Sequence, residues 1–125
     1  MTLDKLDHLF DLRKDFMNHL ESHKPGSYPE WPMDISKKES QQLIRDLALK
    51  GVEEMFEALG HLKNWMPHRD TENPEFDREE FVEEVVDAFN YFLSMLVLVG
   101  VTSEELYESY CEKDKKIHRR LKSGY

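Results

Sequence analysis

Two pairs of acidic residues are the part of this sequence best suited to chemistry. Glu54 and Glu57 stand three residues apart, and Glu84 and Asp87 repeat that spacing further along the chain. On a helix, residues at i and i+3 project from the same face, so each pair presents two carboxylates at one level. Ionised carboxylates that are brought together repel one another unless a cation lies among them. The cation that this pattern favours is Mg²⁺, which prefers oxygen ligands and often accompanies phosphates, with Mn²⁺ as an alternative.

Helices must position these acids, since no segment of the sequence alternates as a strand would. Apolar periodicity and end signals predict four of them, at about 3–22, 36–66, 77–100 and 102–121. The second should begin with a capping box from Ser36 to Glu39 and stop before Pro67, while Gly100 should end the third. The fold class is therefore all-α, and we expect a four-helix antiparallel bundle that forms a single domain over residues 1–125.

The register of the second and third helices should bring the two acidic pairs together. A polar loop of about residues 66–76 joins these helices, so they should pack antiparallel as neighbours. Glu57 lies eight residues before Trp65, at the end of one helix, and Glu84 lies seven residues after Asp77, at the start of the next. The two pairs should then face each other across the hairpin.

Both acidic pairs interrupt apolar faces. One face combines Leu47, Gly51, Glu54 and Ala58, and the other combines Glu84, Ala88, Tyr91 and Met95. Buried unpaired carboxylates cost free energy or become protonated, so partial burial of four of them favours a metal site. The alternative is that an acidic chain shows this spacing by chance on solvated faces. Phe56 and Trp65, which are large and apolar, are expected in the core.

Composition and charge narrow the class of protein. The 125 residues, 39% of them hydrophobic and 34% charged, suit one helical domain with its own core. Acidic residues outnumber basic ones by 26 to 17, and a net charge of -9 disfavours nucleic acid as a partner. The apolar stretch 91–99 is too short to span a bilayer, the N-terminus lacks the order of a secretion signal, and the single Cys111 has no partner for an internal disulfide. We therefore expect a cytoplasmic protein that binds no membrane.

From about Leu43 onward, the chain resembles the all-α nucleoside triphosphate pyrophosphohydrolases, which comprise MazG-like proteins, dCTP pyrophosphatases and dimeric dUTPases. Their motif of E-E-x-x-E, a spacer and E-x-x-D matches residues 53–57 and 84–87. The resemblance extends to residues 61–65 and to the C-terminal Tyr110, Lys113, Arg120, Gly124 and Tyr125. It implies hydrolysis of dUTP or another nucleoside triphosphate between the α- and β-phosphates, which releases the monophosphate and pyrophosphate.

The resemblance also implies roles for individual residues. The metal ligands would be Glu54, Glu57, Glu84 and Asp87. Glu54 and Glu57 are the catalytic candidates, with Glu54 the first choice to orient the attacking water. The triphosphate would be contacted by Lys113 and Arg120, which lie about two turns apart on nearly one helix face, and by Lys63. Most of the basic residues near the C-terminus have an alternative explanation, because the helix macrodipole alone favours cations there.

Two further residues are candidate substrate ligands. Asn90 stands three residues after Asp87, and Trp31 lies in the stiff loop 28–32, where its ring could stack on a nucleobase. Trp31 could equally plug the open end of the bundle. Asn18 is the nearest substitute for the glutamine and asparagine with which dimeric dUTPases contact the uracil edge, so the sequence leaves the base open.

The chain is shorter than most dimeric dUTPases, so part of each site could come from a second subunit, and we expect a homodimer or homotetramer. A different class also fits an acidic cluster: a helical scaffold or adaptor without catalysis, whose acidic groove binds a cation or a basic peptide. A di-iron site is disfavoured because it would require Glu-x-x-His spacing. His61 and His68 could touch phosphate, but isolated histidines near a helix end are more often structural or solvated.

Overall fold

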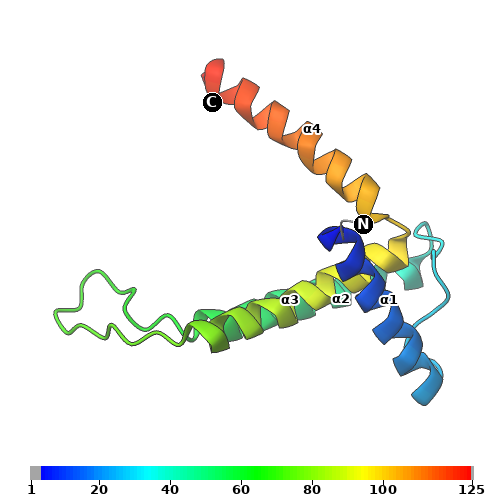
Figure 1. The fold of residues 1–125 in the computed structure, drawn as a ribbon, viewed down its shortest axis with the longest axis horizontal. Coiled ribbons are helices and arrows are strands. Elements are labelled where there is room, and N and C mark those ends of the chain that lie inside the picture. Colours follow the sequence, from blue (N-terminus) through cyan, green and yellow to red (C-terminus); the bar gives the residue numbers. More distant parts are fainter. Residues whose placement is uncertain (1–3, 125) are drawn as a thin grey trace. The chain divides into compact units, whose positions relative to one another are not determined.

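The computed structural model describes residues 4–124, and within that range every regular element is an α-helix. Four helices follow one another: α1 (Lys5–His23), α2 (Lys38–Leu59), α3 (Arg78–Val99) and α4 (Ser103–Lys122) (Figure 1). The predicted all-α class is therefore confirmed. Across residues 4–124, none of the helices alone combines the length and the apolar content needed to cross a membrane.

The chain divides into two compact units. One is Asp34–Met95, which contains α2 and most of α3, and we call it the hairpin unit. The other combines the residues up to Met33 with those from Leu96 onward, so that it contains α1, the last turn of α3 and α4, and we call it the terminal unit.

Helix α3 begins and ends as its sequence predicts. The Asp77 carboxylate accepts the backbone N–H of Glu80 at 3.1 Å, which satisfies one of the free donors in the first turn. Gly100 follows the last turn with a φ of 89°, a conformation that glycine adopts without strain. At α4, the Thr102 hydroxyl likewise accepts the N–H of Glu105 at 3.1 Å.

The predicted start of α2 is wrong by two residues. The Ser36 hydroxyl donates to the Asp34 carboxylate at 2.6 Å instead of capping the helix. Lys37 is the N-cap residue, and its side chain makes no capping hydrogen bond. The expected capping box fails because Asp34, two residues earlier, offers Ser36 a stronger, charged acceptor.

The predicted end of α2 is also wrong, because the helix stops at Leu59 and not near residue 66. The N–H groups of His61 and Leu62 bond to carbonyls three residues back, at 3.1 and 3.0 Å, so the chain leaves the helix through a tight turn at Gly60. The connecting loop therefore covers residues 60–77 and extends beyond both helices (Figure 1). Trp65 lies in this loop and is 65% exposed, so its predicted place in the core is wrong.

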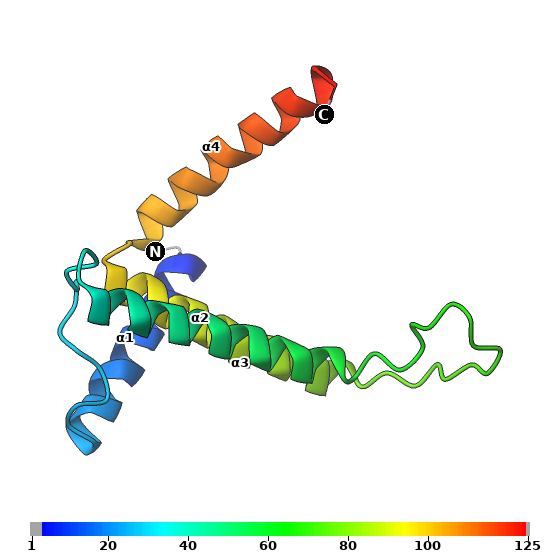
Figure 2. The ribbon, with the colours of Figure 1, turned by 180° about the vertical axis from the view of Figure 1, so that it is seen from behind.

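Helices α2 and α3 pack side by side and antiparallel, as both views show (Figures 1 and 2). The contact is close at Gly51, where an added methyl group would lie 2.8 Å from the ring of Phe92. The predicted inward faces are confirmed, since Leu47, Gly51 and Ala58 are buried on α2 and Ala88 is buried on α3. Phe56 was expected in the core but is 65% exposed, because it projects from the other side of α2.

The terminal unit has its own buried side chains and its own loop contacts. Phe10 and Met17 are buried two turns apart on α1, and Val97 and Leu98 are buried at the end of α3. The backbone N–H of Met33 donates to the Leu98 carbonyl at 2.8 Å, which holds the loop after α1 against the end of α3. Helix α4 contrasts with α1, because none of its described residues is buried.

Candidate metal centre

The hairpin brings three of the four predicted metal ligands into one group. Glu54 of α2 and Glu84 and Asp87 of α3 each offer a carboxylate oxygen, and these three oxygens lie within 4.8 Å of one another. The register explains this grouping: beyond the Gly51–Phe92 contact, each further turn of α2 meets an earlier turn of α3. Glu54 and Glu84 are half-buried and Asp87 is exposed.

Glu57, the fourth predicted ligand, lies against the same group. Its proximity contributes, through charge and hydrogen bonding, to the raised pKa of both Glu54 and Glu84. We call the set of Glu54, Glu57, Glu84 and Asp87 the acidic quartet.

The carboxylates of the quartet repel one another, as the raised pKa values of two members indicate. The pKa of Glu54 is raised above its ordinary value of 4.5, first by partial burial, then by a hydrogen bond to Glu57 and by the charges of Glu57, Asp87 and Glu84. The pKa of Glu84 is also raised, first by burial and then by the charges of Glu57 and Asp87, while His61 acts in the opposite direction. A divalent cation would relieve this repulsion, and carboxylate oxygens are the donors that Mg²⁺ prefers, so the quartet fits the expected ion.

A second group adjoins the quartet one turn closer to the loop. His61, Glu80 and Glu84 each offer one ligand atom, and these three atoms also lie within 4.8 Å of one another. Sequence reasoning gave no metal role to His61 or Glu80. The spacing was a signal, because His61 stands four residues after Glu57 and Glu80 stands four residues before Glu84, the interval that would place residues on one face of a helix.

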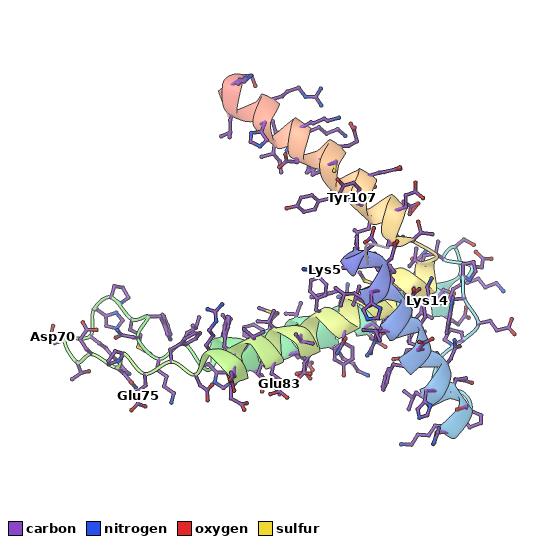
Figure 3. The ribbon with its side chains drawn as sticks, in the orientation of Figure 1. Lys5, Lys14, Asp70, Glu75, Glu83 and Tyr107 are labelled. Carbon is purple, nitrogen blue, oxygen red and sulfur yellow. The ribbon has the colours of Figure 1, made fainter. Side chains whose placement is uncertain are left out.

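Lys63, a predicted phosphate ligand, lies just beyond α2 in the same unit. It lines an open hollow of about 640 Å³ together with His61 and the segment from Glu75 to Glu79. Glu75 and Asp70 belong to the loop that extends from the hairpin (Figure 3). Asn90, half-buried on α3, follows Asp87 by one turn. The hairpin unit thus contains the quartet and two of the five predicted substrate ligands.

Trp31 and Asn18, which the sequence connected with base recognition, line one hollow in the terminal unit. Its volume is about 430 Å³, and Tyr28, Pro29 and Glu30 line it as well. Trp31 is half-buried, so its ring is neither fully packed nor fully solvated. This hollow combines an aromatic plate with an amide side chain, which are the groups that stack on and hydrogen-bond to a planar ring.

Lys113 and Arg120 lie exposed on α4, also in the terminal unit. Tyr107 projects from the same helix (Figure 3). The ion pairs within the described part of α4 join neighbouring turns, as between Lys115 and Glu112 at 3.1 Å. The basic end of α4 is therefore available to an anionic ligand, since Lys113 and Arg120 are not engaged in these pairs.

Comparison of the chain with protein-family models, curated proteins and solved structures gives no match.

Proposed function

We propose that this protein is a Mg²⁺-dependent nucleoside triphosphate pyrophosphohydrolase of the all-α family that its motifs resemble. The substrate is dUTP or another deoxynucleoside triphosphate, and the products are the monophosphate and pyrophosphate. The observation that carries the proposal is the acidic quartet, in which carboxylates from two antiparallel helices gather at one level. The proposed architecture is the antiparallel bundle of that family, of which the α2–α3 hairpin is one half.

The quartet serves the proposed reaction by holding Mg²⁺ with its four carboxylates. When bound, Mg²⁺ activates water and neutralises charge on the phosphate oxygens. Glu54 is the first candidate to orient the attacking water, a role that the resemblance implies for this position. Glu57, which lies beside it, is the second catalytic candidate.

Cationic and planar groups supply the substrate contacts in this proposal. Lys63, Lys113 and Arg120 bind the triphosphate through charge-assisted hydrogen bonds, which are stronger than neutral ones. Trp31 stacks on the base, and Asn18 hydrogen-bonds to its edge within the hollow that they share. Asn90, one turn from Asp87, binds the substrate next to the quartet.

The test offers the purified protein a panel of deoxynucleoside and ribonucleoside triphosphates with Mg²⁺ and measures pyrophosphate and monophosphate. We expect turnover of at least one of them. Glu57→Gln should lower kcat by about 100-fold or more, since a lost ligand to the catalytic ion removes several kcal/mol of transition-state stabilisation. Glu83→Gln is the matched control, because Glu83 is exposed on α3 beside Glu84 (Figure 3) and should retain full activity.

Absence of turnover on the whole panel would contradict this function. The acidic quartet would then belong to the alternative class, a helical scaffold whose acidic groove binds a cation. Equal activity of Glu57→Gln and wild type would also contradict it, since the hydrolysis would then proceed without the quartet.

We also propose that the protein acts as a homodimer or homotetramer. Exposed large apolar side chains recur on both helices of the hairpin: Leu49, Val52, Phe56 and Leu59 on α2, and Val82, Val86 and Phe89 on α3. Exposed apolar side chains that gather on a surface mark interaction sites, and a second copy would cover them with the same surface. Light scattering coupled to size exclusion should find an oligomer for wild type and a smaller species for Phe56→Glu. A monomeric wild type at micromolar concentration would refute this assembly.

A further inference from the structure

We propose that His61, Glu80 and Glu84 form a second cation site, selective for Zn²⁺ or a similar borderline transition ion over Mg²⁺. The site adjoins the acidic quartet and shares Glu84 with it. It goes beyond the proposed hydrolase function, because it requires neither a nucleotide nor turnover.

The geometry of the three side chains supports the site. Their ligand atoms lie within 4.8 Å of one another, on two different chain segments that the hairpin holds together. In a tetrahedral site with bonds of about 2.0 to 2.2 Å, ligand atoms lie roughly 3.3 to 3.6 Å apart, so an ion would bind as side-chain rotations bring the three atoms together. Three protein ligands leave further positions for water, as in catalytic zinc sites.

Local hydrogen bonds hold the backbone of the three residues in place. The N–H of His61 donates to the Ala58 carbonyl at 3.1 Å in the turn that ends α2. Glu80 lies in the first turn of α3, where its N–H is held by Asp77 at 3.1 Å, and Glu84 follows one turn later. The site is therefore built on helix ends, which place ligands more reproducibly than a free loop does.

The donor set distinguishes this site from the quartet. The quartet offers only carboxylate oxygens, which suit Mg²⁺, whereas the second site adds an imidazole nitrogen. Imidazole favours borderline ions such as Zn²⁺ and binds Mg²⁺ poorly. The open hollow lined by His61 and Lys63 gives an ion a route from solvent to the imidazole.

Sharing of Glu84 couples the two sites. One carboxylate can bridge two ions, but its charge is then divided between them. Occupation of the second site by Zn²⁺ should change the Mg²⁺ affinity of the quartet, and by linkage Mg²⁺ should change the Zn²⁺ affinity by the same factor.

The experiment titrates the protein of residues 1–125 with Zn²⁺ while Mg²⁺ is present in excess and nucleotide is absent. Nuclear magnetic resonance of ¹⁵N-labelled imidazole rings identifies the histidine that binds. We expect the ring signals of His61 to shift before one equivalent of Zn²⁺ is added. In calorimetry, Zn²⁺ affinity should fall by at least about tenfold in His61→Ala and in Glu80→Gln, since loss of even an outer-shell partner typically costs that much.

Matched variants separate this site from other surface ligands. Glu83→Gln and His68→Ala should bind Zn²⁺ as wild type does, because both residues lie outside the group. His19 and His23, whose ring centroids lie 4.4 Å apart on α1, are the competing pair for Zn²⁺. Unchanged His61 signals while those of His19 and His23 shift would overturn the proposal, as would wild-type Zn²⁺ affinity in His61→Ala. Both outcomes are independent of hydrolysis, so an inactive protein that binds Zn²⁺ at His61 would contradict only the proposed function.

Discussion

Glutamates in the two units have opposite surroundings. In the terminal unit, the Glu21 carboxylate accepts the backbone N–H groups of Gly26 and Tyr28, both at 2.8 Å, and these bonds lower its pKa. In the hairpin unit, burial and neighbouring carboxylates raise the pKa of Glu54 and of Glu84. Folding therefore stabilises the ionised form of Glu21, whereas it destabilises the ionised forms of Glu54 and Glu84.

This difference separates an acid whose charge the fold stabilises from acids whose charge the fold opposes. Glu21 ties down the loop after α1, so its charge is satisfied by the chain itself. The quartet members have one another as neighbours, and the charges of these neighbours oppose the ionisation of Glu54 and Glu84. Residues that oppose stability in this way are candidates for function.

The largest expected effect is the stabilisation of the hairpin unit by Mg²⁺. A ligand that binds only the folded chain adds about 2.7 kcal/mol to the free energy of unfolding at one hundred times its Kd. Thermal unfolding should therefore shift upward with Mg²⁺ in wild type and in Glu21→Gln, but much less in Glu54→Gln. Without Mg²⁺, Glu54→Gln should be at least as stable as wild type, because it removes a repelled charge. An undiminished Mg²⁺ response in Glu54→Gln would show that the ion binds elsewhere.

An intermediate effect is expected from Gly51→Ala, which perturbs the helix contact that sets the quartet's register. The new methyl group would meet the Phe92 ring at 2.8 Å, and such overpacking typically costs about 1 to 3 kcal/mol. Urea unfolding should report this loss, together with a weaker Mg²⁺ response. The double variant with Phe92→Leu should recover part of both, because the smaller side chain makes room. Full stability of Gly51→Ala alone would mean that the helices separate without cost.

The smallest expected effect is the pH dependence of stability in a buffer that contains a metal chelator. This measurement compares the two units most directly. The folded pKa of Glu54 lies above its unfolded value near 4.5, so its stability contribution is present below 4.5 and is lost as pH rises through the folded pKa. The folded pKa of Glu21 lies below 4.5, so its contribution is present above 4.5 and is lost as pH falls through the folded pKa.

Urea unfolding of wild type, Glu54→Gln and Glu21→Gln between neutral pH and about pH 4 would measure both contributions. The advantage of Glu54→Gln over wild type should shrink as pH falls. The disadvantage of Glu21→Gln should persist down to 4.5 and shrink below it. If the free energy of unfolding changed with pH in the same way in all three proteins, the glutamates of the two units would not differ as proposed.

The fold class and most helix boundaries could be predicted because their causes are local. Asp77, Gly100 and Thr102 act through backbone geometry and short hydrogen bonds within a few residues, which a sequence pattern contains. The two errors at α2 have the opposite cause. Ser36 had a competing acceptor in Asp34, and the chain leaves the helix at Gly60 although apolar residues continue to Met66.

The grouping of acids from the two helices was predicted for the same reason. Spacing of three residues placed each acidic pair on one face, and antiparallel neighbours made the pairs meet. The acidic pairs meet although the loop is longer than predicted, because helix packing at Gly51 and Phe92 determines the register. Phe56 was assigned to the core in error, because periodicity alone cannot say which of two apolar faces the neighbouring helix covers.

The sequence by itself determined that the chain is helical and which acids share a helix face, since both follow from residue spacing and local hydrogen bonding. Only the tertiary structure decided that Glu54, Glu84 and Asp87 meet, that His61 and Glu80 join Glu84 beside them, and that Glu21 is instead satisfied by its own loop. Those outcomes depend on how closely two helices approach and where a loop turns back, and such distances arise from packing between segments far apart in the chain.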